Sequence, residues 1–144
     1  MAAAPGCPLC EGEGGALVAR TDRLRVIRAA EPGFPGFYRV VWADHVAEFS
    51  DLAPADRQHC MDAVVLVEEA VRRHLRPDKI NLAALGNVVP HLHWHVIARY
   101  RWDERFPGAV WAAPQRTAPA EQLAAIEAAL PAVDRHIAAA LARL

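Results

Sequence analysis

The chain has 144 residues, of which 53% are hydrophobic and 23% are charged, and its formal net charge is −1 at pH 7. This length and composition fit one folded domain and exclude a disordered chain. A net charge near zero gives no positive field for DNA, RNA or an anionic membrane, and no apolar run reaches the ~18 residues of a membrane span. We therefore expect neither nucleic acid nor a membrane as a partner.

The first fifteen residues are mostly small and contain one distinctive pair, Cys7 and Cys10, in a Cys-Pro-Leu-Cys motif. This start has no basic cluster and no long apolar stretch, so we expect no secretion signal. An odd number of cysteines, three, fits the reducing cytoplasm, where paired cysteines hold metal more often than they form disulfides. The motif has the spacing of half a tetrahedral zinc site, and a pair of free or transiently oxidised thiols is the alternative.

Five segments have the β-branched and aromatic composition of strands, and they cover residues 16–20, 24–29, 37–43, 79–85 and 91–100. The first two are separated by a hairpin-length connection, and a loop with two prolines and two glycines precedes the third. Short connections between strands, with few helices, favour an α+β fold with an antiparallel sheet.

Two helices are expected. Pro54 suits a first helical turn, and apolar residues then recur at spacings of three and four as far as Leu75, before Pro77 stops the helix. A second apolar stripe runs from Leu123 to the end of the chain, and Pro131 inside it should kink or divide that helix.

The segment of residues 91–97 alternates three histidines with bulky apolar residues, which is the period of a half-buried strand. His91, His93 and His95 would then share one face, about 6.6–6.8 Å apart. Imidazoles near neutral pH serve as bases, nucleophiles or metal ligands. No carboxylate lies between His91 and Tyr100, which argues against a catalytic metal and favours attack by the central imidazole on phosphorus or an acyl centre. A metal cluster and solvent-facing edge histidines are the alternatives.

This pattern, His-φ-His-φ-His-φ-φ with φ apolar, resembles the signature of the histidine triad (HIT) nucleotide hydrolases and transferases, and residues 91–97 match every position. The likeness extends to Asn81, residues 86–90 and His45. A bacterial branch similar to diadenosine tetraphosphate hydrolases also resembles the chain over residues 106–111.

The resemblance implies a HIT-like fold over a single domain of residues 1–144. This fold would have a five-stranded antiparallel sheet with a long helix packed on it. Residues 117–144 would form a C-terminal helical extension. Family members pair into homodimers with a continuous sheet, so a homodimer is expected. Trp102, Phe106 and Trp111 in the irregular segment after the histidines suit a dimer contact or, alternatively, base stacking.

The resemblance also implies roles for single residues. His93 would be the nucleophile that takes up the nucleoside phosphoryl group, His95 would contact the scissile phosphate and leaving group, and His91 would buttress the strand or serve a metal. Asn87 stands where many members place a phosphate-contacting glutamine, and Asn81 would sit at the edge of the same pocket. Turn formation is the alternative role of each asparagine.

The implied substrate is a purine nucleotide, either a dinucleoside polyphosphate or a nucleoside phosphoramidate, cleaved through a covalent nucleotidyl-histidine without a metal in the chemistry. Many members have histidine at the position of Phe37 and serine or threonine at that of Val88, so the fine specificity is open. Two other functions remain as alternatives. One is a non-catalytic, zinc-containing nucleotide-binding dimer that acts as a sensor or interaction module, and the other is a metal-dependent hydrolase.

Some bacterial members similar to this chain have an N-terminal Cys-x-x-Cys, a histidine after the third strand and the first triad histidine as metal ligands. Here these residues are Cys7, Cys10, His45 and His91. Four such ligands close a structural zinc site, which would clasp residues 1–15 beneath the strand of histidines.

Overall fold

A computed structural model describes residues 3–144, so the first two residues of the predicted zinc-clasped segment lie outside the described residues. In chain order the elements are α1 (Pro8–Glu11), β1 (Ala16–Arg20), β2 (Leu24–Arg28), β3 (Phe37–Trp42), the 3-10 turn η1 (Phe49–Asp51), α2 (Pro54–Leu75), β4 (Lys79–Ala83), β5 (His93–Arg99) and α3 (Ala120–Leu141). The predicted α+β fold is confirmed, as are the five strands and the two long helices.

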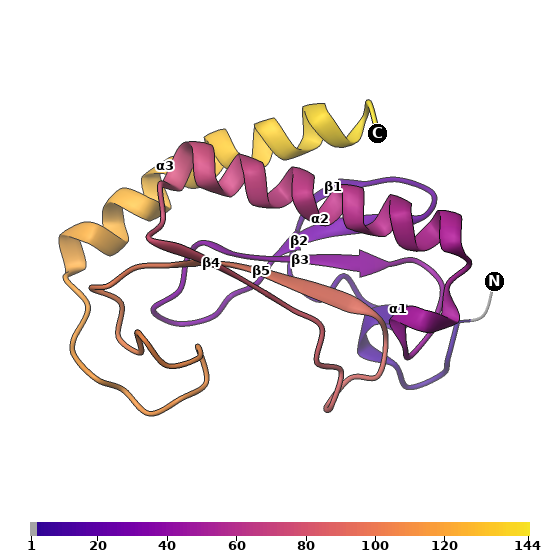
Figure 1. Ribbon diagram of the computed structural model, residues 1–144, viewed down its shortest axis with the longest axis horizontal. Coiled ribbons are helices and arrows are strands. Elements are labelled where there is room, and N and C mark those ends of the chain that lie inside the picture. Colours follow the sequence, from indigo (N-terminus) through magenta and orange to yellow (C-terminus); the bar gives the residue numbers. More distant parts are fainter. Residues whose placement is uncertain (1–2) are drawn as a thin grey trace.

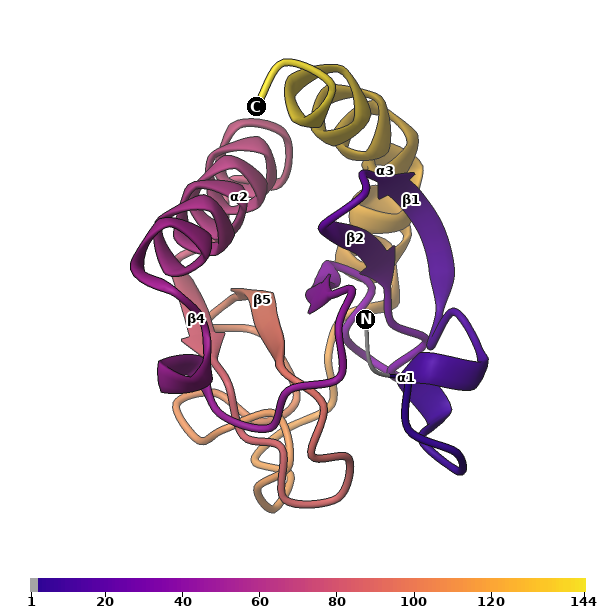
Figure 2. The same ribbon diagram turned by 90° about the vertical axis from the view of Figure 1, so that its right-hand side faces the viewer.

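All neighbouring strands of the sheet are antiparallel, and their order is β1-β2-β3-β5-β4. Because β5 lies between β3 and β4, α2 carries the chain from the middle of the sheet to its far edge. Both long helices cover one face of the sheet, and α1 and the long loops lie on the other (Figures 1 and 2). The sheet therefore has one face covered by helices and one face covered by loops.

The main core lies between the sheet and the two helices. Alternate residues of β3, namely Tyr38, Val40 and Trp42, are buried there, as is Val96 of β5. From α2 they meet a stripe of small and branched side chains: Cys60, Ala63, Val64, Val67, Ala70, Val71 and Leu75. The alternation leaves the intervening residues of β3 and β5 to face the loops, and those residues build the site described below.

α3 is one helix that continues through Pro131, so of the two predicted outcomes, a kink or a division, the division does not occur. Pro131 is exposed, and its missing N–H removes the helical hydrogen bond to the Glu127 carbonyl. Three residues after the proline, the helix is anchored by Asp134, which accepts the Tyr38 O–H at 2.7 Å and an Arg28 N–H at 3.1 Å. Five apolar residues on both sides of the proline are buried: Ile126, Leu130, Val133, Ile137 and Leu141.

Neither long helix is suited to a bilayer, since no helix among residues 3–144 combines the length and the hydropathy that a membrane crossing requires.

Candidate active site and metal centre

The loop-covered face of the sheet contains a cavity of about 490 Å³. His93 and His95 of β5 and Arg39 of β3 form its floor, and residues 85–89 and Trp111 contribute from two loops. The N-terminal segment completes the lining with Pro8, Leu9 and Gly14. Segments distant in sequence thus meet over the histidines.

His93 is half-buried, and its Nδ1 lies 2.6 Å from the carbonyl oxygen of His91. A carbonyl oxygen can only accept a hydrogen bond, so Nδ1 carries the proton and Nε2 holds the lone pair. Burial lowers the pKa of His93 below its usual value, although the bond to the His91 carbonyl acts in the opposite direction. His93 is therefore a neutral imidazole with its basic nitrogen free, as nucleophilic attack requires.

His95 has the other tautomer. Its Nδ1 accepts a hydrogen bond from Arg39 Nε at 3.3 Å, so the proton lies on Nε2. The ring is 4% exposed and packs 5.0 Å from the His93 ring and 5.4 Å from the rings of Phe37 and Trp111. Burial, followed by the charges of His93 and Arg39, lowers the pKa of His95 to about 4. His95 is thus a neutral hydrogen-bond donor beside the His93 ring.

His91 does not belong to the strand, because β5 begins at His93 and the His91 N–H bonds the Val89 carbonyl at 2.9 Å in a tight turn. The predicted row of three histidines on one strand is therefore wrong in its extent. His91 is 1% exposed, and its Nε2 donates to the Trp42 carbonyl at 2.6 Å. This bond fixes the proton on Nε2 and turns the Nδ1 lone pair toward two sulfur atoms.

Those sulfur atoms belong to Cys7 and Cys10, which lie 3.5 and 3.4 Å from His91 Nδ1, and His45 Nδ1 lies 3.5 Å from Cys10 Sγ. The four predicted ligand atoms all lie within 4.8 Å of one another. In a tetrahedron with Zn–S bonds of about 2.3 Å and Zn–N bonds of about 2.0–2.1 Å, sulfur and nitrogen stand about 3.6 Å apart. The donor set and its spacing are therefore compatible with a structural zinc ion.

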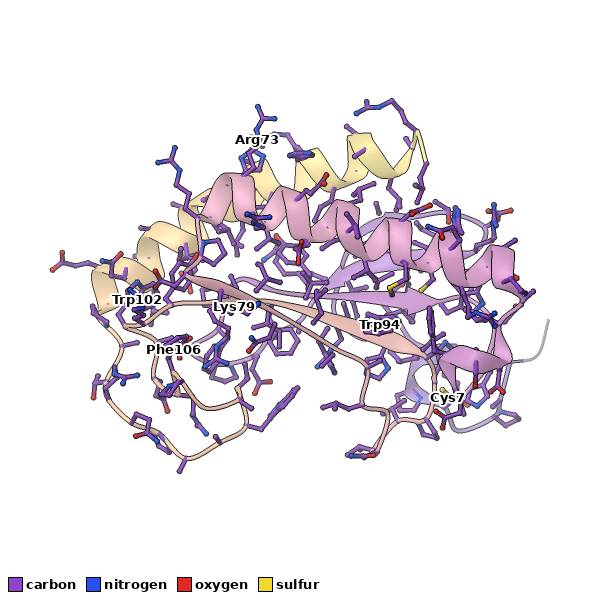
Figure 3. The ribbon with its side chains drawn as sticks, viewed as in Figure 1. Cys7, Arg73, Lys79, Trp94, Trp102 and Phe106 are labelled. Carbon is purple, nitrogen blue, oxygen red and sulfur yellow. The ribbon has the colours of Figure 1, made fainter. Side chains whose placement is uncertain are left out.

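This cluster lies directly beside the cavity. Cys7 is found near the start of β5, on the side of the sheet away from α2 and α3, whereas Phe106 lies toward the other end of the strand (Figure 3). Pro8 and Leu9, inside the Cys-x-x-Cys motif, line the cavity themselves. A metal held here would fix one wall of the candidate active site.

The two predicted asparagines are separated. Asn87 is exposed at the cavity, next to Val88, which is 93% exposed. Asn81 lies on β4 outside the cavity lining, and its Oδ1 accepts a hydrogen bond from Arg99 at 2.8 Å. Phe37 is fully buried beneath His95. The structure thus brings Asn87, His93 and His95 together at the cavity, whereas the Asn81 side chain is hydrogen-bonded to Arg99.

Arg99 anchors the loop that carries Trp111. It is 2% exposed and forms a two-fold hydrogen-bonded ion pair with Asp103, at 2.8 and 3.1 Å. A further N–H donates to the Gly108 carbonyl at 2.7 Å. Sequence reasoning missed this role because an arginine at the end of a strand also suits a solvated edge.

Arg39 was missed as well, although the sequence holds a signal for it. It is the one charged residue in the strand sequence FYRVVW, and strand alternation places it on the face opposite Tyr38 and Val40. Only the register, which pairs Arg39 with His95, shows what it meets there.

Comparisons with known proteins agree with this geometry. The model of the HIT domain family matches residues 14–102. A histidine triad protein of Bradyrhizobium japonicum is 28% identical over 87% of this chain and 92% of its own, with a TM-score of 0.72. A histidine triad protein of Marinobacter aquaeolei is 26% identical over 88% of this chain and 93% of its own, with a TM-score of 0.69. A histidine triad protein of Sinorhizobium meliloti is 25% identical over 87% of this chain and 88% of its own, with a TM-score of 0.68. A search of curated proteins found no match.

Proposed function

This chain belongs to the HIT domain family, whose members are generally nucleotide-binding hydrolases and transferases, and from that premise we propose that it cleaves a nucleotide through a covalent nucleotidyl-histidine on His93. The observation that carries the proposal is the 2.6 Å bond from His93 Nδ1 to the His91 carbonyl. This bond leaves Nε2 as the free basic nitrogen of a side chain that lines the cavity.

In the first step the Nε2 lone pair of His93 attacks the nucleoside phosphorus atom. A P–N bond forms, the bond from phosphorus to the leaving group breaks, and its electron pair stays with the leaving group. His95 Nε2–H donates a hydrogen bond to the atom on which that charge develops. In the second step water attacks phosphorus, the P–N bond breaks, and its electron pair returns to Nε2 while the water proton passes to solvent.

The substrate we propose is a purine nucleotide, either a dinucleoside polyphosphate or a nucleoside phosphoramidate, as in the bacterial branch similar to diadenosine tetraphosphate hydrolases. Asn87, exposed at the cavity, is proposed to contact a phosphate. Asn81 is proposed to act indirectly, since its side chain holds Arg99.

We further propose that Cys7, Cys10, His45 and His91 hold a structural zinc ion, which would clasp the N-terminal segment against β5. When bound, such an ion supplies folding free energy and no reaction step, because four protein ligands leave no open position for water. Both motif cysteines carry free thiols in the structure, which suits the cytoplasm as the proposed compartment.

A homodimer is also part of the proposal. β4 is an edge strand of the sheet, and Leu82 on it and Leu85 just after it are 42% and 53% exposed. A free edge with apolar side chains favours pairing with another chain. Sedimentation of the wild type should give a dimer and Leu82→Glu should shift it toward the monomer; a monomeric wild type would contradict this part.

The test of the activity compares His93→Ala with a matched control, His59→Ala, whose ring lies near Trp42 of the helix-covered face. On a panel of dinucleoside polyphosphates and adenosine phosphoramidates, His93→Ala should lose about 10³-fold or more in kcat while the protein stays folded. His59→Ala should keep the wild-type rate. Undiminished turnover by His93→Ala would refute the assignment.

The second candidate function is a zinc-containing nucleotide-binding dimer without turnover. The apolar side chains of Phe37 and Val88, where many members have polar ones, favour it. Nucleotide binding by the wild type with no product release and no protein-bound nucleotide would select this function.

A further inference from the structure

Arg39 lines the cavity from the middle of β3, and its backbone pairs in register with that of His95. Its Nε donates to His95 Nδ1 at 3.3 Å, and its guanidinium carbon stands 5.2 Å from the centre of the Phe37 ring. These two contacts fix the guanidinium on one side. Its two terminal nitrogens form no hydrogen bond with any residue of the described chain, 3–144.

Three other arginines that are at least half-buried have their charge compensated. Arg99 pairs with Asp103, Arg28 pairs with Asp134, and Arg25 donates to three backbone carbonyls. Arg39 differs from these three, since no carboxylate of residues 3–144 forms an ion pair with it. The negative charge of Glu31 acts on Arg39 but does not outweigh the burial that lowers the pKa of its guanidinium.

A cation that is removed from water without a paired anion costs free energy, which an anion bound in the cavity would recover. The guanidinium has a planar set of N–H donors that matches a phosphate in a two-fold contact. The free donors of Arg39 and the Nε2–H of His95 both belong to residues of the cavity floor. The floor therefore offers donors to the oxygens of a leaving phosphate.

We propose that Arg39 is a specificity-determining residue that binds the anionic leaving group and, through Nε, holds His95 as the Nε2–H tautomer. This inference rests on the proposed function and deepens it, because it selects dinucleoside polyphosphates over phosphoramidates. When the P–O bond of a polyphosphate breaks, the electron pair remains on a phosphate oxygen, and the leaving group departs as an anion without a proton.

A phosphoramidate has a leaving group with a different requirement. When its P–N bond breaks, the leaving amine takes the electron pair and requires a proton to depart. A neutral imidazole that carries its single proton on Nε2 gives up that proton poorly. A guanidinium beside the departing amine gives no charge stabilisation, so Arg39 favours the polyphosphate alone.

The test compares wild type, Arg39→Met and Arg39→Lys by kcat/KM on diadenosine tetraphosphate and on adenosine 5′-phosphoramidate. Arg39→Met should lose about 10²-fold on the tetraphosphate and about 3-fold or less on the phosphoramidate, with Arg39→Lys between wild type and Arg39→Met. Arg101→Met, which removes an exposed arginine outside the cavity lining, should leave both values unchanged.

The tautomer gives a readout that a merely structural role would not move. Long-range ¹H–¹⁵N correlation spectra of the imidazoles should show His95 protonated at Nε2 in the wild type and a mixture of tautomers in Arg39→Met. An equal loss on both substrates, no loss at all, or a wild-type His95 protonated at Nδ1 would overturn the inference while His93 remains the nucleophile. A wild type that cleaves neither substrate would overturn the proposed function and this inference with it.

Discussion

Replacing Asp103 by asparagine should be among the most destabilising isosteric changes in this chain. The carboxylate is 2% exposed and accepts two hydrogen bonds from Arg99. It also accepts backbone N–H groups of Tyr100, Arg105 and Phe106 at 3.1, 3.0 and 2.7 Å. The asparagine amide keeps the shape of the carboxylate but carries no charge, so the buried Arg99 guanidinium loses its ion-pair partner. Its NH₂ group would also face the N–H groups that the carboxylate accepts.

Loss of one partner of a buried ion pair costs about 3–5 kcal/mol. With an unfolding entropy of about 2.1 cal/mol/K per residue, this chain should lose about 10–17 °C in Tm. Calorimetry and urea titration of Asp103→Asn would measure the change. The matched control is Glu104→Gln, which breaks a partly exposed pair with Arg105 and should cost at most about 1 kcal/mol. A loss below about 1 kcal/mol in Asp103→Asn would refute the assigned role of the Arg99–Asp103 pair.

Three other predictions follow from the site. Because the pKa of His95 is lowered to about 4 in the folded state, the unfolded chain binds the extra proton first, so stability should fall by up to about 3 kcal/mol between pH 6.5 and 4. Urea titrations should show a shallower fall for His95→Gln, and an unchanged slope would contradict the shift. Chelator treatment should lower Tm by about 10 °C or more and open the N-terminal segment to proteases, as Cys10→Ser should without chelator; an unaffected Tm would argue against the metal. Trp111→Ala should raise KM by about 10- to 100-fold through lost base stacking while kcat changes less, whereas an unaltered KM would remove Trp111 from the binding site.

Local sequence patterns predicted most of the fold, because the spacing of apolar residues and the positions of proline and glycine largely determine where helices and strands begin and end. Alternation located the strands, and spacings of three and four located α2 to within a residue of its observed end. The sequence left open whether Pro131 would kink or divide the second helix; α3 is continuous, with buried apolar residues on both sides of the proline, and only the tertiary structure shows that packing.

The candidate site was predictable only in part. The three histidines of the triad are close together in sequence, and so are Cys7 and Cys10. These cysteines and His45 reach His91 only through the fold, and the resemblance to a family was needed to select the four ligands. The pairing of Arg39 with His95 depends on strand register, and a one-residue slip would send Arg39 into the helix-covered core. Such tertiary contacts have no local signature.

The most direct test of the nucleotidyl-His93 intermediate is mass spectrometry of enzyme mixed with diadenosine tetraphosphate and quenched rapidly in alkali, which preserves a P–N bond. We predict adenylate on the tryptic peptide of residues 80–99, attached to His93 and lost on acid treatment. Turnover without any protein-bound nucleotide, or adenylate on a different side chain, would contradict the account.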